Sequence, residues 1–159
     1  MKPILNKEYM RLAIKEARKN ISHMHGGPFG ACIVKGDKVI ALAKNTVFKN
    51  GPTCHAEINA IKIASKKLKT IDLSGCHIYS TTEPCPMCFS AIHWARIDLV
   101  VFGTNISDVK KIGFNELTIS NSKLKKHGKS KIKIKPDFLR KECYNILLDW
   151  NALDNKVVY

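Results

Sequence analysis

The sequence predicts an α/β protein with a central mixed five-stranded sheet and helices on both faces of the sheet. Short apolar runs alternate along the chain with segments in which apolar residues recur every three to four positions. Glycine and proline separate these segments, as they do at the ends of helices and strands. The length of 159 residues suits one domain, so we expect residues 1–159 to fold as a single unit.

The first quarter of the chain predicts a helix followed by a β-hairpin. Residues 6–20 form the helix, because apolar side chains recur there at helical spacing and Asn6 can cap the start. The glycine-rich run 26–30 ends this region. Two apolar runs follow, over 31–35 and 38–43, and the Gly-Asp pair between them is typical of a tight hairpin.

The middle of the chain predicts two more helices, each next to a strand. A loop is expected over 45–53, where an Asn-Gly-Pro run breaks the pattern, and a helix over about 54–68. A short strand over 76–80 precedes a third helix over 86–95, which has proline in its first turn, a position where proline is well tolerated. A buried strand over 99–102 completes this part.

The last third of the chain has a weaker pattern. A helical turn is expected near 107–112, and the lysine-rich stretch 121–135 is ambiguous. Its end, 131–135, alternates like an edge strand with outward lysines. Residues 136–150 are expected to form the closing helix.

The net charge of +14 is a feature of many nucleic-acid-binding domains, but the composition weakens that interpretation. The basic residues are nearly all lysine, and the chain is also rich in Ile and Asn. This mix is typical of a genome biased toward A and T, so the lysine excess says little about partners. Charge alone therefore does not favour a nucleic-acid partner.

The cysteines point to one metal site and to several core thiols. Of the six cysteines, only Cys85 and Cys88 have the spacing of metal ligands. Cys32 and Cys76 lie in apolar stretches and are expected to pack in the core, and Cys54 is expected to pack near the metal rather than bind it.

The sequence contains no sign of a membrane partner. No stretch approaches the roughly 18 apolar residues that cross a bilayer. The start of the chain, residues 1–8, is too polar for a secretory signal. A reducing, cytoplasmic setting suits thiols that must stay free for a metal.

Two short motifs carry the chemistry. His55-Ala56-Glu57 is followed about thirty residues later by Pro84-Cys85-Pro86-Met87-Cys88, which is the pattern of zinc-dependent base deaminases. One imidazole and two thiolates leave the fourth tetrahedral position of Zn²⁺ open for water. Glu57 is not needed as a ligand, so it can carry protons between that water and a substrate. Backbone N–H groups near Ala56 and Cys85 could stabilise developing charge.

A closed zinc site that only holds loops together is the structural alternative. Such a site needs a fourth protein ligand, for which Cys54, His77 and His93 are the nearby candidates. It would also leave Glu57 without a role. We therefore predict a catalytic site with one Zn²⁺ per subunit.

With these motifs the chain resembles the cytidine-deaminase superfamily and, more narrowly, the small bacterial guanine deaminases. The matching segments are 26–31, 52–57, 83–88, 91–96 and the tail 150–159, so that nearly the whole chain is covered. The resemblance implies the three-layer α/β/α cytidine-deaminase-like fold. It implies that His55, Cys85 and Cys88 hold zinc and that Glu57 shuttles protons.

The same resemblance implies the residues that contact a purine base. Asn45 would hydrogen-bond the ring beside Ala56, Phe29 and Trp94 would line the base pocket, and Tyr159 would close it. Plain alternatives remain open at this stage. Asn45 could be a turn residue, the two aromatic residues could belong to the core, and Tyr159 could be a frayed end.

The chain departs from the guanine deaminase pattern at one position. Where those enzymes have an Asp, this chain reads Gly113-Phe114-Asn115-Glu116. Glu116 keeps the charge but is one methylene longer, so it could accept hydrogen bonds from purine N–H groups or shift the preferred base. An exposed loop acid is the alternative.

The resemblance also implies a homodimer and a small-molecule purine substrate. The C-terminal segment, about 136–159, would close the active site of its own subunit or, if the segment is exchanged between subunits, that of the partner. The predicted reaction converts guanine to xanthine and ammonia.

Three alternatives remain open. The first is a tRNA deaminase that converts the wobble adenosine to inosine, although residues 105–113 lack the run that such enzymes usually have and an aromatic tail would crowd RNA. The second is a deaminase of guanosine, cytosine or another amino-substituted heterocycle. The third is a zinc-bound binding module without activity.

Overall fold

The helices and strands of the computed structural model follow the predicted order. The structure describes residues 5–159, so half of the polar start compared above with a secretory signal lies outside the described residues. The helices are α1 (Lys7–His23), α2 (Val47–Asn50), α3 (Ala56–Leu68), α4 (Pro86–Trp94), α5 (Ile106–Lys111), α6 (Asn121–His127) and α7 (Arg140–Asn151). The strands are β1 (Gly30–Lys35), β2 (Lys38–Lys44), β3 (Cys76–Thr82), β4 (Leu99–Thr104) and β5 (Lys133–Lys135).

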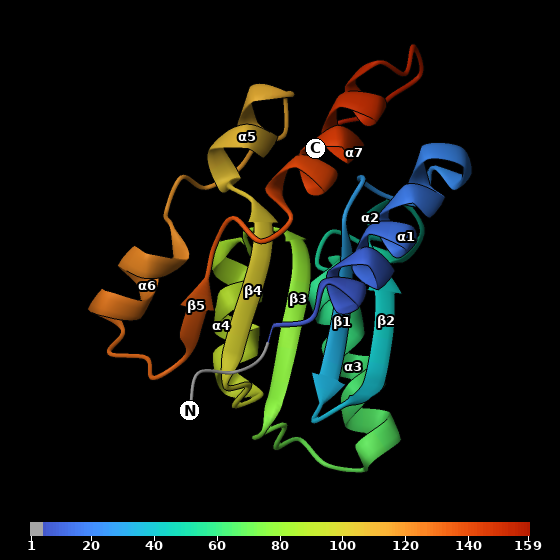
Figure 1. Ribbon diagram of the computed structural model, residues 1–159. Coiled ribbons are helices and arrows are strands. Elements are labelled where there is room, and N and C mark those ends of the chain that lie inside the picture. Colours follow the sequence, from blue (N-terminus) through green and yellow to red (C-terminus); the bar gives the residue numbers. More distant parts are fainter. Residues whose placement is uncertain (1–4) are drawn as a thin grey trace.

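The strands form one five-stranded sheet in the order β2-β1-β3-β4-β5 (Figure 1). β1 pairs antiparallel with both β2 and β3, whereas β3, β4 and β5 are parallel. The predicted mixed sheet is therefore confirmed. Parallel neighbours require a crossover between them, and α4 makes the crossover from β3 to β4.

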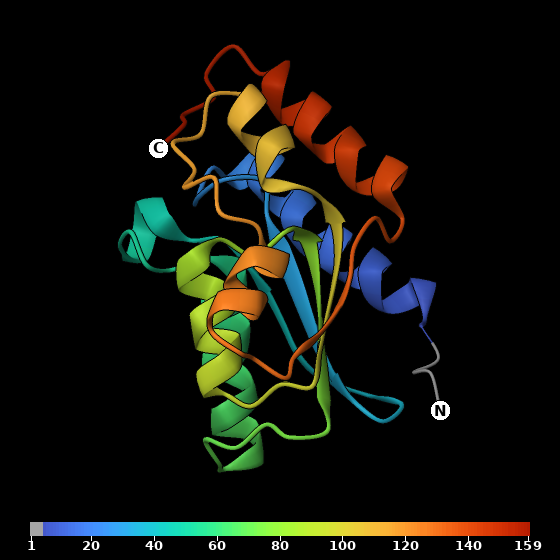
Figure 2. The same cartoon turned by 90° about the vertical axis from the view of Figure 1, so that its left-hand side faces the viewer.

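Helices cover both faces of the sheet, as Figure 2 shows from the side, with α3 and α4 on one face and α1 and α7 on the other. Successive side chains of a strand point to opposite faces. Ile78 accordingly packs in the core that includes Ala60 of α3, while Tyr79 packs in the core that includes Met10 of α1. This alternation produces two apolar cores, one on each face.

The beginning of β1 requires glycine because α1 packs directly against it. A Cβ atom on Gly30 would lie 2.1 Å from the carbonyl oxygen of Ala13, which is far inside van der Waals contact. The glycine-rich run leads into β1 at this point. Because β1 is antiparallel to β2 and β3, it begins at the end of the sheet where β2, β3 and β4 terminate. Loops from four strands therefore meet at one end of the sheet.

Local structure differs from the prediction in two places. The expected loop over 45–53 contains the single helical turn α2. The closing helix begins at Arg140 rather than at residue 136, because Asp137 and Leu139 have left-handed backbone, with φ of 58° and 50°. A helix cannot pass through residues in that conformation.

The lysine-rich stretch contains α6 and the edge strand β5. Lys133 and Lys135 are exposed on that strand, which confirms the predicted outward lysines. The helical turn expected near 107–112 is present as α5, shifted by one residue.

The cysteines of the described region are all free thiols. Cys32 and Cys76 are fully buried, as expected for core thiols, and burial raises the pKa of Cys32 to about 12. Across residues 5–159, no helix combines the length and apolar character needed to span a membrane.

Candidate active site

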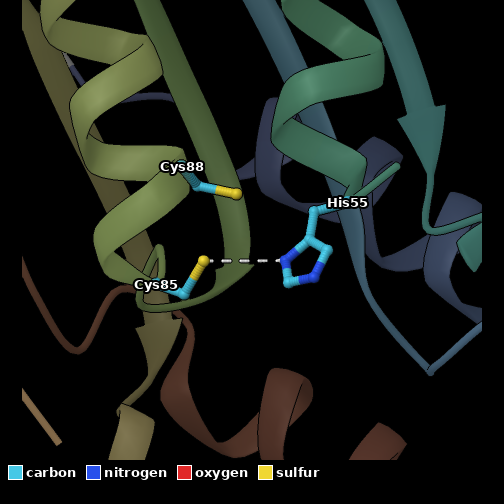
Figure 3. A group of neighbouring side chains, drawn as sticks. All are labelled: His55, Cys85 and Cys88. Carbon is cyan, nitrogen blue, oxygen red and sulfur yellow. Dashed lines mark hydrogen bonds between the residues drawn. The ribbon is translucent and has the colours of Figure 1, made fainter. Parts of the chain in front are cut away.

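The starts of two helices bring the predicted metal ligands together. His55 is the residue that caps α3, Cys85 caps α4, and Cys88 lies in the first turn of α4 (Figure 3). One ligand atom from each residue lies within 4.8 Å of the others, and Cys85 Sγ is 3.7 Å from His55 Nδ1. Tetrahedral zinc with ordinary Zn–S and Zn–N bonds separates such atoms by about 3.6 Å. The three side chains therefore fit one zinc ion.

The electrostatics of this group favour a thiolate. The Cys88 side chain and His55 together lower the pKa of the Cys85 thiol to about 4, against the opposing effect of burial. Cys85 also lies at the N-terminus of α4, where the unpaired N–H groups of the first turn stabilise negative charge. A ligand that is already deprotonated binds a metal without first releasing a proton.

No fourth ligand closes the group within residues 5–159. Cys54 Sγ is directed to the carbonyl oxygen of Asn50 at 3.4 Å, and His93 lies at the opposite end of α4, with Nδ1 3.2 Å from Ser130 Oγ. His77 is in β3, at the end of that strand far from Cys85. The arrangement leaves one tetrahedral position open, which is the mark of catalytic rather than structural zinc sites.

Glu57 lies beside the ligand group without joining it. Its side chain is 3% exposed, and its Oε1 accepts a 2.8 Å hydrogen bond from Ser80 Oγ. Its Oε2 accepts from Cys88 Sγ at 3.5 Å. Burial raises the pKa of Glu57, with partial compensation from the charge of His55. A carboxyl group whose pKa is raised in this way binds a proton more readily than one in water and can pass it on to a substrate.

An aromatic wall faces the metal-ligand group. Phe29 packs edge-on against Phe114, with ring centroids 5.1 Å apart, and Phe114 packs edge-on against Tyr159 at 5.1 Å. Tyr159 also lies edge-on to His55 at 6.1 Å and to Phe48 at 5.5 Å. The structure thus places Phe29 and Tyr159 in one aromatic cluster beside His55 and adds two phenylalanines, Phe48 and Phe114, to it.

Asn45 and the end of the chain contact each other in this wall. The side-chain amide of Asn45 is fully buried, and its Nδ2 donates to the hydroxyl of Tyr159. The Oδ1 of Asn45 accepts from the backbone N–H of Val47 at 3.1 Å. The carbonyl oxygen of Tyr159 accepts from the N–H of Asn115 at 2.8 Å, so that two bonds hold the tail of the same chain over the site.

Glu116 and Ala56 lie at the edges of the same site. Burial raises the pKa of Glu116 to about 7, and the nearby charge of Cys85 adds to this increase while that of His55 opposes it. Ala56 is fully buried and is the first residue of α3.

Trp94 is not part of this group, contrary to the expectation that it lines the base pocket. It is 82% exposed at the C-terminal end of α4, where its ring meets His93 edge-on. Cys85 precedes the first residue of that nine-residue helix, which is about 13 Å long. The two ends of α4 therefore cannot reach the same pocket within one chain.

Two residues that support the site were not predicted from the sequence. Ser80 in β3 holds Glu57, as described above. Asn20 of α1 is fully buried, and its Nδ2 donates to the carbonyl oxygens of Gly27 at 2.7 Å and Asn45 at 2.8 Å. The sequence did offer a signal for Asn20, because it is a polar residue at a position where the helical pattern of α1 calls for an apolar one. Phe48 and Phe114 had no such signal, since an aromatic residue in a loop has many possible partners.

Comparison with known protein families gives one match over most of the chain. The model of the cytidine and deoxycytidylate deaminase zinc-binding region matches residues 4–104. This range contains the two helix starts with His55, Cys85 and Cys88. The geometry and the family match therefore agree on a zinc-binding site.

Similar proteins include deaminases of two substrate classes. Guanine deaminase of Bacillus subtilis (strain 168) is 40% identical over 109 residues, which cover 68% of this chain and 70% of that protein. The tRNA-specific adenosine deaminase of Buchnera aphidicola subsp. Schizaphis graminum (strain Sg) is 36% identical over 149 residues, which cover 92% of this chain and 94% of that protein. The solved guanine deaminase of Nitrosomonas europaea superposes with a TM-score of 0.85 at 30% identity, covering 95% of this chain and 87% of that one.

Proposed function

The chain belongs to the family of deaminases that have the cytidine and deoxycytidylate deaminase zinc-binding region. Within this family, we propose that it deaminates guanine. The overall reaction consumes guanine and water and releases xanthine and ammonia. The observation that carries the choice of guanine is the position of Tyr159, which lies against His55 and bonds to Asn45. A free base needs little space beside this tail, whereas an RNA loop must compete with it.

Guanine also suits the polar groups around the site. Its edge presents neighbouring N–H donors, and the carboxylate of Glu116 is an acceptor for them. Asn45 can both donate to and accept from a purine ring. The rings of Phe29 and Phe114 offer apolar contact for the flat base. We assign these residues to substrate binding, together with the backbone N–H of Ala56.

Glu57 is the proposed proton carrier. When bound, zinc would supply an acidified water at the open fourth position, with His55, Cys85 and Cys88 as its ligands. Glu57 accepts a proton from the attacking water and passes it to a ring nitrogen of the base. It then takes the remaining proton of the added oxygen and gives it to the amine, so that the C–N bond breaks, the new carbonyl forms and ammonia leaves. Ser80 keeps the carboxyl group oriented for both transfers.

We also propose a homodimer of cytoplasmic subunits, in which residues 136–159 close the site. The exposed ring of Trp94 supports a surface that a second copy covers. The bond from Asn45 to Tyr159 within one chain supports closure of the site by the tail of the same subunit. Light scattering on wild type and on Trp94→Glu tests the dimer, and a monomeric wild type would contradict it.

A second candidate function is deamination of the wobble adenosine of tRNA. The 92% coverage of this chain by a tRNA-specific relative and the net charge of +14 favour it. An RNA substrate would require the tail to move away from Asn45. Binding of tRNA that weakens steeply with salt would support this alternative.

The deciding experiment is ammonia release by the zinc-loaded protein with guanine, guanosine, adenine, cytosine and tRNA in parallel. We expect turnover of guanine and at most slow turnover of the others. The variant Glu57→Gln provides the blank for contaminating activity. Inosine formation in tRNA without guanine turnover would overturn the proposal and establish the second candidate.

A further inference from the structure

A hollow lies at the end of α4 that is remote from the metal-ligand group. It is bounded by the turn between α4 and β4 and by the loop that connects α6 with β5. This turn and this loop lie near the bottom of the sheet in Figures 1 and 2. Its volume is about 560 Å³, which is within the range of roughly 300–1,000 Å³ for small-molecule sites. The hollow shares no lining residue with the aromatic wall or the ligand group.

Positive charge dominates the lining. Arg96, Lys129, Lys131 and Lys133 contribute cations, and Asp98 is the acidic residue among the lining side chains. The segment 117–136, which provides three of these lysines, contains no Asp or Glu. A hollow with this balance attracts anions, and its low-dielectric walls strengthen the attraction.

The cations of the hollow are not used up by ion pairs. Arg96 Nη1 contacts Asp72 Oδ2 at 2.7 Å, which occupies one part of a guanidinium group that carries five donors. Within residues 5–159, Lys129, Lys131 and Lys133 form no ion pair. Their ammonium groups are available to an incoming anion.

The lining also contains hydroxyl and apolar groups. Ser130 places a hydroxyl group next to the cations, 3.2 Å from His93 Nδ1, whereas the Ser74 hydroxyl in the lining donates to Asp72 Oδ1. Ile97 and Ile132 form the floor of the hollow, and because they are 1% and 5% exposed, only a small apolar area of this floor is open to a ligand. A bare inorganic anion would make no use of that floor, whereas the sugar or base of a nucleotide would pack against it.

We propose that this hollow binds a phosphate-bearing organic molecule of nucleotide size. The phosphate groups contact the three lysines and Arg96, and the organic part lies on Ile97 and Ile132. This proposal goes beyond the deaminase reaction and does not depend on it. The hollow and the metal-ligand group lie at opposite ends of α4, so one ligand cannot fill both.

Calorimetric titration of the zinc-loaded protein at physiological salt tests the site, with GTP and inorganic triphosphate as probes. Salt at that level suppresses non-specific contacts between exposed charges. We expect GTP to bind more tightly than inorganic triphosphate, because only GTP uses the apolar floor. The variant Lys129→Ala/Lys131→Ala/Lys133→Ala should weaken GTP binding by about tenfold or more, because charge-assisted hydrogen bonds to phosphate are lost.

A matched variant separates the hollow from the general basic surface. Lys123→Ala/Lys126→Ala/Lys135→Ala removes the same charge from three exposed lysines that do not line the hollow. Its effect on GTP binding should stay within about threefold, as expected of exposed charges in salt. Both variants should unfold at the wild-type temperature and keep the wild-type rate of ammonia release.

Three results would overturn the proposal. Equal loss in the two triple variants would mean that GTP binds to diffuse surface charge. Equal affinity for GTP and inorganic triphosphate would mean that the organic part makes no contact. Absence of GTP binding at millimolar concentration, or binding only of single-stranded RNA, would exclude a nucleotide site.

Discussion

The two sides of the active site are built in different ways. The metal-ligand side consists of His55, Glu57, Cys85 and Cys88, which come from the first turns of two helices or from the residues that cap them. The base-facing side is made of loop residues and of Tyr159 at the very end of the chain.

This difference teaches how chemistry and specificity are divided. Two rigid helix starts hold the groups that must lie within a few tenths of an ångström of a reactive geometry. The base-facing side depends on long-range contacts, such as the bond between Asn45 and Tyr159, and a few substitutions can change it. The family resemblance is accordingly strongest for the reaction and leaves two substrate classes open.

The largest expected effect comes from breaking the metal-ligand side. Cys85→Ser should lose its zinc and with it the deaminase activity, because a hydroxyl group is a far weaker zinc ligand than a thiolate. Metal analysis and ammonia release measure the two losses. Cys54→Ser is the control, since Cys54 is buried nearby but bonds to Asn50, and it should keep one zinc per chain. Full zinc content in Cys85→Ser would refute the ligand assignment.

The next effect separates proton transfer from metal binding on the same side. Glu57→Gln should lower kcat by about 10²–10⁴-fold, the usual contribution of a general acid–base group. Its zinc content should be unchanged, because Glu57 lies outside the ligand group. The exposed Glu8 supplies a control through Glu8→Gln. Wild-type kcat in Glu57→Gln would remove Glu57 from the proposed mechanism.

A smaller effect is expected on the base-facing side. Tyr159→Phe removes the hydroxyl that accepts from Asn45 and keeps the ring against His55. One such hydrogen bond corresponds to about 1 kcal/mol, so KM for guanine should change by about fivefold with kcat nearly constant. Tyr144→Phe on α7 serves as the matched control. A loss in kcat comparable to that of Glu57→Gln would show that the two sides do not act separately.

The smallest effect is a pH dependence of stability in the zinc-free protein. Burial raises the pKa of Glu116 from 4.5 to about 7 in the folded chain. Between these values the folded chain binds more protons than the unfolded chain, so the contribution of Glu116 to stability is lost as pH rises toward 7.

Thermal unfolding of wild type and Glu116→Gln between pH 4 and pH 8 measures this contribution. The melting temperature of wild type should fall relative to that of the variant up to about pH 7 and stay parallel above it. The melting temperature of the control Glu8→Gln should change with pH in parallel with that of wild type over the whole range. A constant difference between wild type and Glu116→Gln would place the Glu116 carboxyl group in water.

The sequence determined most of the fold and the whole metal-ligand side. Apolar periodicity identified four of the five longest helices and the strands, because one face of each element must be buried. It could not locate the start of α7, since the left-handed backbone of Asp137 and Leu139 is imposed by their surroundings. The spacing of Cys85 and Cys88 places both at one helix start, and the pattern of zinc-dependent base deaminases was sufficient to predict that His55 meets them.

Tertiary structure alone decided the base-facing side and the hollow beyond α4. Phe48 and Phe114 have no local signal, and Asn20 has only its polarity within an apolar series. Their contacts exist only after segments distant in sequence have packed. Trp94 is the opposite case. A family motif predicted that it lines the pocket, but it lies at the end of α4 away from the pocket of its own chain. Local spacing determines which side chains one element presents, whereas the packing of elements determines which of those side chains meet.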